Sequence, residues 1–563
     1  DLAITNATQP GQSRVIEKGT KNEFYTVNLF SDYSRQLGDH YFKVMGGFNA
    51  EHQNVRTLST QRDGIIVPDL PTIDTSTEQD VAGGGYNHWA TAGFFGRLNY
   101  NYKEKYLLEV NGRYDGTSRF MKDQRWNFFP SFSLGWNVAR ENFWKPLESV
   151  VNQFKLRGSW GELGNQNTSN LYPFYEILPV KSNSGNWLVN GGKTNTADIP
   201  SLVSTLLTWE RVRSFNVGFD FGAFSNRLTG SFDYFVRKAV DMVGPAPQLP
   251  LVLGIAPAIV NNADMKSYGF EIELSWRDRI GEVDYGVKFN LADAQQKVVK
   301  YPNTTNAFSD WYAGKMSGEI WGYTSLGIAK TDEEMKEHLA SLPNGGQNQL
   351  GNKWGAGDIM YADINGDGKI DGGKGTLADP GDQRIIGNST PRYNFGLVLD
   401  ASYKGFDVSI FFQGVGKRDY APIVGTNGAV FWGAVNNIWQ SMAMEEHFDY
   451  FRPEGHPMGA NLNGYYPRPD FTSNKNHQVQ TRYLQDASYI RLKNLQIGYT
   501  LPKQWINKLH INRCRVYVSG DNLWTGTSLA SMFDPETLAA GDWGSGKTYP
   551  LSKVISFGLN VNF

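Results

Sequence analysis

The last residues of the chain, Ser552-Lys-Val-Ile-Ser-Phe-Gly-Leu-Asn-Val-Asn-Phe563, decide its fold class. Apolar residues recur at every second position from Ile555 to Phe563, and the positions between them carry Ser, Gly or Asn. Side chains of a β-strand alternate between two faces, so a period of two indicates a strand. This stretch therefore predicts a strand with one apolar face and one polar face.

The same alternation recurs along the whole chain and predicts about fifteen strands. Soluble strands usually have about 5–6 residues, whereas a tilted strand needs about 9–11 residues to cross a bilayer. Many of the predicted strands reach the longer length, which favours an all-β membrane protein. The predicted strands cover residues 23–33, 40–52, 93–103, 105–115, 129–139, 152–163, 208–221, 226–238, 264–277, 282–292, 392–403, 404–415, 487–500, 511–522 and 552–563.

The predicted connections alternate between short and long. Short ones include 34–39, Lys103–Lys105, Lys404–Gly405, 222–225 and 277–283; long ones cover 53–92, 164–207, 239–263, 293–391, 416–486 and 523–551. Aromatic residues such as Tyr102, Tyr106 and Phe406 gather at the short turns. Short periplasmic turns, long outside loops and an aromatic girdle are typical of outer-membrane β-barrels. A soluble sandwich would have no reason to place its long loops at one end.

The polar face of the predicted strands carries many charges. Burial of such charges in a dry core would cost several kcal/mol each, so we expect a wide, wet or plugged lumen. A β-propeller or a set of soluble sandwiches is the alternative. The predicted inward residues include Asp220, Asp233, Arg237, Glu271, Glu273, Asp284, Lys288, Arg491 and Arg515.

The composition excludes several classes of protein. The 563 residues include 54 Lys+Arg and 56 Asp+Glu, a net charge of −2, so a dedicated nucleic-acid binder with its basic excess is excluded. One cysteine, Cys514, permits no internal disulfide and no cysteine-based zinc site. The sequence contains no apolar run of about 18 residues, so it predicts no membrane-spanning helix.

Counting turns predicts that further strands precede this sequence. The short turn after the first strand and the long loop before the last one make both strands run inward, so their number is odd. Single-chain bacterial barrels close with an even number of strands. We therefore expect residues 1–563 to be the C-terminal part of a barrel that is completed by strands before Asp1.

Several ordered motifs resemble the SusC/RagA family of TonB-dependent outer-membrane transporters of Gram-negative bacteria. The similarity covers nearly the whole chain, and the motifs occur in the family's order. The matching stretches include Gly96–Leu108, Arg113–Phe120, Phe129–Trp136, Lys155–Asn165, Gly269–Leu274, Asp363–Asp371, Pro391–Gly396, Ala487–Pro502 and Arg515–Leu523.

This resemblance implies a transmembrane antiparallel barrel of 22 strands around an N-terminal plug, of which about fifteen are present here. The plug, the TonB box and the first strands would precede Asp1. It also implies import of an oligomeric glycan or peptide, energy from TonB, and a SusD-like surface lipoprotein that closes over the outside loops. The terminal aromatic Phe563 fits the signal that the barrel-assembly machinery reads; an ordinary edge-strand aromatic is the alternative.

The sharpest local motif is Asp363-Ile-Asn-Gly-Asp-Gly-Lys-Ile-Asp371. Asp363, Asn365, Asp367 and Asp371 occupy positions 1, 3, 5 and 9 of a calcium loop, and the Lys369 carbonyl occupies position 7. Position 12 is Lys374 instead of Glu, so Asp379 or Asp382 would have to fold back. The spacing predicts weak Ca²⁺ binding; an Asx-rich turn is the alternative.

Aromatic residues in the predicted outside loops are candidates for substrate or partner contacts, because rings stack on sugars while nearby amides bond hydroxyls. The alternative is that they pack the loops together. Their positions are Trp187, Trp311, Tyr312, Trp321, Trp354, Phe431, Trp432, Trp439 and Trp543.

No hydrolase or metal-protease motif is present, and the eight histidines are scattered. We therefore expect no catalytic residues and no required cofactor. The first hypothesis is a nutrient importer. The others are an outer-membrane enzyme, for which no rim constellation is visible, and an adhesin or passive pore, which would not need the long 293–391 loop.

Overall fold

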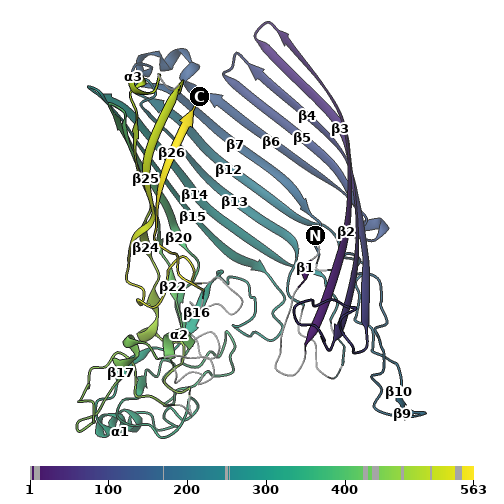
Figure 1. Cartoon of the computed structure of the whole chain (residues 1–563), viewed down its shortest axis with the longest axis vertical. Helices are drawn as coiled ribbons and strands as arrows, with labels where there is room; N and C mark the ends of the chain where they lie inside the picture. Colours follow the sequence, from purple (N-terminus) through teal and green to yellow (C-terminus); the bar gives the residue numbers. More distant parts are fainter. Residues whose placement is uncertain are drawn as a thin grey trace. The chain divides into compact units, whose positions relative to one another are not determined.

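The computed structural model describes residues 3–4, 13–168, 170–246, 252, 254–255, 257–422, 429–433, 443–470, 474–507, 510–538 and 548–563. Its main feature is an antiparallel sheet in which strand order follows chain order (Figure 1). The two-residue strand β1 (Ala3–Ile4) comes first, and fifteen long strands follow. Their bounds are β2 (Arg14–Leu37), β3 (His40–Asp63), β4 (Val81–Tyr102), β5 (Tyr106–Thr117), β6 (Trp126–Asn137), β7 (Val151–Asn165), β12 (Glu210–Ala223), β13 (Leu228–Val243), β14 (Asn261–Ile280), β15 (Val283–Lys300), β20 (Arg392–Tyr403), β21 (Phe406–Lys417), β24 (Tyr489–Thr500), β25 (Arg513–Thr527) and β26 (Val554–Asn562).

These fifteen strands confirm the predicted ones, each in its predicted place. The remaining strands and the α-helices are short and lie in the connections. They are β8 (Val180–Lys181), β9 (Leu188–Val189), β10 (Gly192–Lys193), β11 (Thr196–Ala197), β16 (Glu319–Gly322), β17 (Ser325–Ile328), α1 (Asp332–Ala340), β18 (Ile359–Tyr361), β19 (Arg384–Asn388), β22 (Asp419–Tyr420), α2 (Ala429–Trp432), β23 (Gln485–Asp486) and α3 (Lys503–Ile506). Within the described part of the chain, no helix is long and apolar enough to cross a bilayer.

The chain forms two compact units. The first comprises Asp1–Asn137, Arg157–Phe215 and Arg237–Asp264, and the second comprises Val138–Leu156, Asn216–Val236 and Met265–Phe563.

In the first unit, β2 and β3 pair along their full length, from Arg14 opposite Asp63 to Leu37 opposite His40. β2, β3 and β4 extend well beyond the predicted strands, so the connection predicted at 53–92 occupies only 64–80. The additional strand residues are polar on both faces, as at Thr57 and Thr60. Backbone hydrogen bonds between the strands continue there, although the apolar alternation has stopped. The prediction of the loop bounds was wrong because it followed side-chain periodicity alone.

The second unit contains the consecutive strands β15, β20, β21, β24, β25 and β26. Two of its short turns have two residues: Gly281–Glu282 and Lys404–Gly405. Lys404 and Gly405 have φ values of 46° and 92°, as hairpin turns that match the strand twist require. Aromatic rings line these turns as predicted, with Phe406 and Tyr499 only 4.5 Å apart between centroids.

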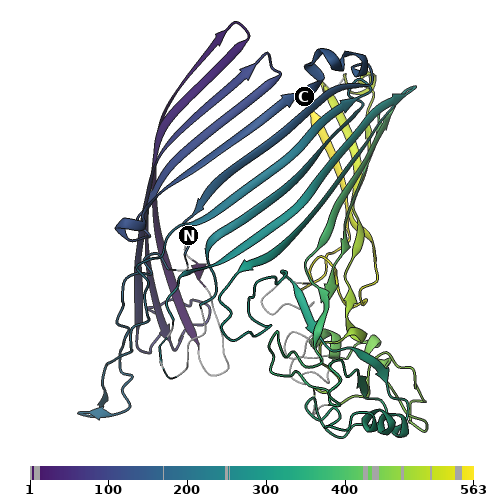
Figure 2. The ribbon, with the colours of Figure 1, turned by 180° about the vertical axis from the view of Figure 1, so that it is seen from behind.

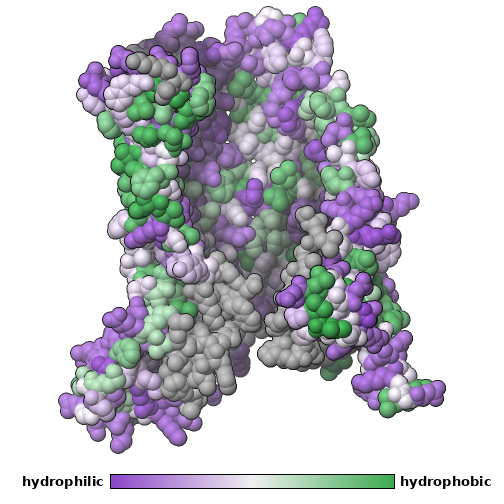
Figure 3. Space-filling model, in the orientation of Figure 1, coloured by the Kyte–Doolittle hydropathy of each residue, from purple (hydrophilic) through white to green (hydrophobic). Residues whose placement is uncertain are grey.

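The two faces of these strands differ in polarity. On β26, Ile555 and Phe557 are 67% and 85% exposed, although both are large and apolar. Figure 3 shows hydrophobic side chains gathered over β24, β25 and β26. Ser556 and Asn560, which alternate with them, stand opposite Ser519 and Arg515 of β25. An exposed apolar strand face of this extent indicates contact with lipid or a partner.

At the other end of β20, β21 and β24 from α3, the connections of the second unit fold into a compact body (Figures 1 and 2). We call the described parts of 301–391, 418–486 and 528–538 the loop lobe. It has a hydrophobic core of its own. The fully buried members include Ile359, Tyr361, Ile370 and Phe431.

Candidate functional site

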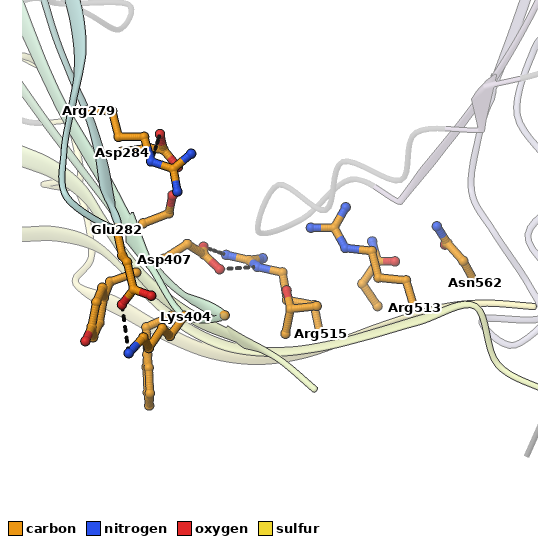
Figure 4. A pocket seen from close by; sticks show the side chains of 14 residues that line it. Arg279, Glu282, Asp284, Lys404, Asp407, Arg513, Arg515 and Asn562 are labelled. Carbon is orange, nitrogen blue, oxygen red and sulfur yellow. Dashed lines mark hydrogen bonds and ion pairs between the residues drawn. The ribbon is translucent and has the colours of Figure 1, made fainter. Parts of the chain in front are cut away.

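The polar face of the second unit ends in a charged recess at the short turns (Figure 4). It has a volume of about 890 Å³. Arg515 donates from Nε to Asp407 at 3.0 Å, and Lys404 lies 2.7 Å from Glu282 across the turns. Arg513 lines the recess beside these pairs. The recess therefore offers an open, charged surface at the strand ends.

Further along the same face, polar side chains of neighbouring strands bond one another. Asn494 donates to Asp521 at 2.7 Å, and Arg515 donates to Gln496 at 2.8 Å. Among the predicted inward residues, Asp284 and Arg515 line the recess. Arg491 has a different role, because it is buried and donates to Asp534 at 2.9 Å, which ties the loop lobe to β24.

The first unit has a similar polar site on its own strands. A cavity of about 360 Å³ is lined by Arg97, Asn111, Arg113 and Glu162, among others. Glu162 is nearly buried and lies 2.5 Å from Arg213 of β12. Charged groups on this face are thus paired and hydrogen-bonded.

The loop lobe is held by a buried ionic network that sequence reasoning missed. Asp358 is fully buried. It accepts hydrogen bonds from Lys475 at 2.9 Å, from Arg468 at 2.8 Å and from Asn476 at 2.9 Å. Since Asp358 and Lys475 are 117 residues apart, no local sequence pattern predicts this contact. A buried carboxylate needs such partners to offset its lost hydration.

Several predicted loop aromatics pack within the lobe. Trp321 stacks on Phe308 with centroids 4.5 Å apart. Tyr312 donates to Glu319 at 2.6 Å, and burial is the main cause that raises its pKa. Trp354 donates to the Gly351 carbonyl at 3.0 Å.

The remaining predicted aromatics differ in exposure. Trp311 lies edge-on to Tyr301, and Phe431 and Trp432 belong to the lobe core. Trp187 is largely exposed in the connection that contains β8 to β11. Trp439 and Trp543 lie outside the described residues.

The predicted calcium loop is organised by Asx turns. Asp363 accepts from the Gly366 and Gly368 amides at 2.7 and 2.8 Å, and Asn365 accepts from the Asp367 amide at 3.0 Å. Lys369 donates to Asp371 at 2.5 Å and lies 3.7 Å from Asp367.

Asp382 folds back onto this loop and accepts from the Ile364 and Asp371 amides at 2.7 and 2.9 Å. Burial raises the pKa of its carboxyl, and the charge of Asp363 adds to that effect. In the part of the chain that the structure describes, no three His, Cys, Asp or Glu side chains are already gathered around one point as metal ligands.

Phe563 follows directly after β26, and its side chain is highly exposed. Strand β26 pairs with β25 on one side and ends the strand order. The terminal aromatic thus stands at the end of the last strand of the sheet.

Comparison with known proteins identifies the barrel. The family model "TonB dependent receptor-like, beta-barrel" matches residues 3–523. The chain is 28% identical to TonB-dependent receptor P3 of Formosa agariphila over 96% of its length and 52% of the relative's. It is 24% identical to TonB-dependent receptor SusC of Bacteroides thetaiotaomicron over 96% of its length and 50% of the relative's. The chain thus spans about half the length of these curated relatives.

The structure of the RagAB peptide transporter is similar in fold. It superposes with a TM-score of 0.77 at 20% sequence identity and covers 98% of this chain and 57% of that one. The alternating strands, the turns and these matches agree on one architecture. The chain belongs to the TonB-dependent receptor-like β-barrel family, of the SusC/RagA type, and its antiparallel strands cross the outer membrane of a Gram-negative bacterium.

Proposed function

We propose that this chain forms the barrel wall of a TonB-energised importer of an oligomeric nutrient, a glycan or a peptide. The observation that carries the proposal is the polar face, which runs along β24 and β25 to the charged recess around Arg513. A lumen lined by polar groups lets a hydrated cargo pass without burial against apolar walls. The matched relatives named as TonB-dependent receptors support the energy source.

The loop lobe favours an importer over a passive pore or an adhesin. A passive pore needs no separately folded body beside its mouth, whereas this lobe has its own core and a buried ionic network. An outer-membrane enzyme would need a reactive group and a base arranged together. We propose no catalytic residues.

Uptake by whole cells tests this function. Cells that carry the complete protein should accumulate a labelled oligomer, and accumulation should fall to background when TonB is deleted. Uptake that persists without TonB would identify a passive pore. Cleavage of the oligomer by the purified protein would instead identify an enzyme, and binding without entry would identify an adhesin.

We propose that the rest of the protein supplies the plug, the TonB-contacting segment and the further strands that complete the barrel beyond β1. The proposal draws on the chain's coverage of about half of its relatives and on the even strand number of closed barrels.

We propose a SusD-like surface lipoprotein as the partner of the loop lobe. Mass spectrometry of the complex purified from outer membranes should reveal both; a stable, active complex that lacks them would contradict the proposal.

We also propose that the Asp363–Asp371 loop binds Ca²⁺ weakly. Asp363, Asn365, Asp367, Asp371 and the Lys369 carbonyl are oxygen donors of the type that calcium prefers. The Lys369 ammonium already neutralises Asp371, so the cation must compete with it. Calorimetry should show weak binding that Asp367→Ala abolishes and Lys369→Met strengthens. Identical heats for all three proteins would exclude the site.

Finally, we propose that Phe563 is the assembly signal of the barrel. Its place after the last alternating strand supports this role. Phe563→Ala should lower the amount of folded protein in the outer membrane without changing the stability of the fraction that folds. Normal levels would leave Phe563 as an ordinary terminal aromatic.

A further inference from the structure

The polar face of β2 carries two phenylalanines, Phe24 and Phe30, which are 52% and 66% exposed. The other even-numbered positions from 22 to 36 hold Asn, Thr, Asp, Ser or Gln. The apolar face of the same strand is the opposite one, where Tyr25, Val27 and Leu29 are exposed. Contact with lipid therefore explains those three residues but does not explain the two rings on the polar face.

A chain of hydrogen bonds lies beside Phe24. Gln53 of β3 stands directly opposite Phe24, accepts from the Trp89 indole at 2.6 Å and donates to Asn22 at 3.0 Å. Because an indole N–H can only donate, the Gln53 oxygen must face Trp89 and its NH₂ group must face the Asn22 oxygen. The NH₂ group of Asn22 is then turned away from Gln53, and this residue is exposed. We call Asn22, Phe24 and Gln53 the first platform.

The same arrangement recurs further along β2. Asn28 stands two residues before Phe30, as Asn22 does before Phe24. Asn28 accepts a hydrogen bond from Asn49, which lies directly opposite it on β3. Asn28, Phe30 and Asn49 form the second platform. The two rings are six residues apart on one face of the strand, which corresponds to about 20 Å along it.

The second platform adjoins a recess of the same polar face. Phe30 lies opposite Gly47 of β3, where a side chain would collide with Phe30 and with the ring of Phe95. Phe95 of β4 also lines the cavity of about 360 Å³ in this unit. The neighbouring strands β2, β3 and β4 thus carry the platforms and the cavity together (Figure 1).

The platforms lie at different depths. Phe24 is thirteen residues before Leu37, the last residue of β2, which is about 43 Å along the strand. With a tilt of about 35–45°, Phe24 lies roughly 30–35 Å from the short turn, beyond an apolar band about 25 Å tall. Phe30 lies within that band. A ligand that arrives from outside therefore meets the first platform before the second.

The chemistry of both platforms matches a neutral sugar. A sugar ring has an apolar C–H face that stacks on an aromatic ring, and hydroxyls at its edge that donate and accept. Each platform combines one exposed ring with two amide side chains, which also donate and accept, and contains no charged group. An apolar peptide side chain would be better held by an enclosed pocket, whereas both rings stand exposed on a strand.

We propose that the two platforms bind two units of one neutral oligosaccharide as it moves along the polar face. This inference rests on the proposed function, because it names a glycan as the cargo. Since the rings are about 20 Å apart along the strand, a disaccharide reaches only one platform, whereas a hexasaccharide reaches both.

Equilibrium binding to the complete protein in detergent tests the proposal. The probes are the hexasaccharides and disaccharides of glucose, mannose, galactose and xylose, and the neutral peptide hexa-alanine amide. At least one hexasaccharide should bind more tightly than the peptide, and at least about tenfold more tightly than its own disaccharide, because it engages both platforms. This comparison uses the unaltered protein and does not depend on the folding of any variant.

Variants assign the binding to the platforms. Phe24→Ala and Phe30→Ala should each weaken the hexasaccharide at least about threefold, and Phe24→Tyr should preserve its affinity. Asn22→Asp still accepts from Gln53 but loses its NH₂ donor, so it should weaken binding several-fold. Phe94→Ala is the matched control, because Phe94 is 56% exposed on the apolar face of β4, and it should leave the affinity unchanged.

An affinity for the peptide that equals or exceeds that for every hexasaccharide would overturn the proposal. So would equal affinity for hexasaccharide and disaccharide, or an unchanged hexasaccharide affinity in both Phe24→Ala and Phe30→Ala. The last result is expected if another part of the complete protein covers the platforms. These assays need no TonB, so energised uptake of a peptide without sugar binding would leave the importer in place and remove the glycan assignment alone.

Discussion

The strands β20, β21, β24, β25 and β26 and the loop lobe belong to the same unit, yet they are stabilised in different ways. The strands expose apolar side chains such as Phe557 and carry their charges around an open recess. The lobe buries apolar rings such as Phe431 and encloses a charge, that of Asp358. The first arrangement suits a sheet whose surroundings are lipid, and the second is that of a water-soluble domain. Within one chain, the strands are therefore adapted to lipid and the lobe to water. Different mutations should destabilise each region.

The largest expected effect is on the lobe. Asp358→Ala removes the buried carboxylate that Lys475, Arg468 and Asn476 bond, and loss of one member of a buried pair typically costs about 3–5 kcal/mol. Hydrogen exchange should show the lobe opening while the strands remain protected. Glu337→Ala, which removes an exposed carboxylate of α1, should change neither region. Equal loss of protection in lobe and strands would show that the two are not separate.

A charge on the lipid-facing side of β26 should affect the strands instead. Leu559→Arg places a cation among apolar neighbours, at a cost of up to about 2–4 kcal/mol near the bilayer midplane. Ser556→Arg, on the opposite face of the same strand, is the matched control and should be tolerated. Urea unfolding in lipid vesicles measures both. A greater loss for Ser556→Arg would reverse the assignment of the faces.

Acid should weaken the lobe more than the strands. The pKa of His477 is lowered by burial from 6.5 to about 4, so the unfolded lobe binds a proton at a higher pH than the folded lobe. The stability is complete above about pH 6.5 and declines as the pH falls toward 4, by about 3 kcal/mol at most.

His477→Gln should flatten this part of the pH profile, measured by proteolysis of the lobe between pH 7 and pH 4.5. His88→Gln, an exposed histidine of β4, serves as the control. A wild-type lobe that is equally resistant at both pH values would contradict the prediction.

The smallest effect is expected at the turns. Lys404 and Glu282 form an ion pair in which both side chains are more than half exposed. Exposed pairs of this kind contribute little, and salt screens them. Lys404→Ala should leave the unfolding midpoint of the strands within error at any salt concentration. A clearly lower unfolding midpoint would show that the ion pair at these short turns is less exposed to water than the open recess indicates.

The strands could be predicted from sequence because their apolar residues recur with period two, as from Ile555 to Phe563. The polar extensions of β2 and β3 lack that period and escaped prediction, since backbone pairing alone maintains them. The structure of the loop lobe could not be predicted from sequence for another reason. Its decisive contacts join distant residues, such as Asp358 to Lys475 and Trp432 to His477. Loop position identified Trp432 as a candidate, but no local pattern pointed to His477.

Single cysteines along β26 would show directly whether its apolar face meets lipid and its polar face meets water. In the complete protein with Cys514→Ser, cysteines at 555, 557 and 559 should be quenched by spin-labelled lipid and protected from a charged maleimide. Cysteines at 556, 560 and 562 should show the opposite behaviour, because their side chains face the hydrated lumen. Alternation in this phase is the result that the account predicts. Uniform labelling, or alternation in the reverse phase, would contradict it.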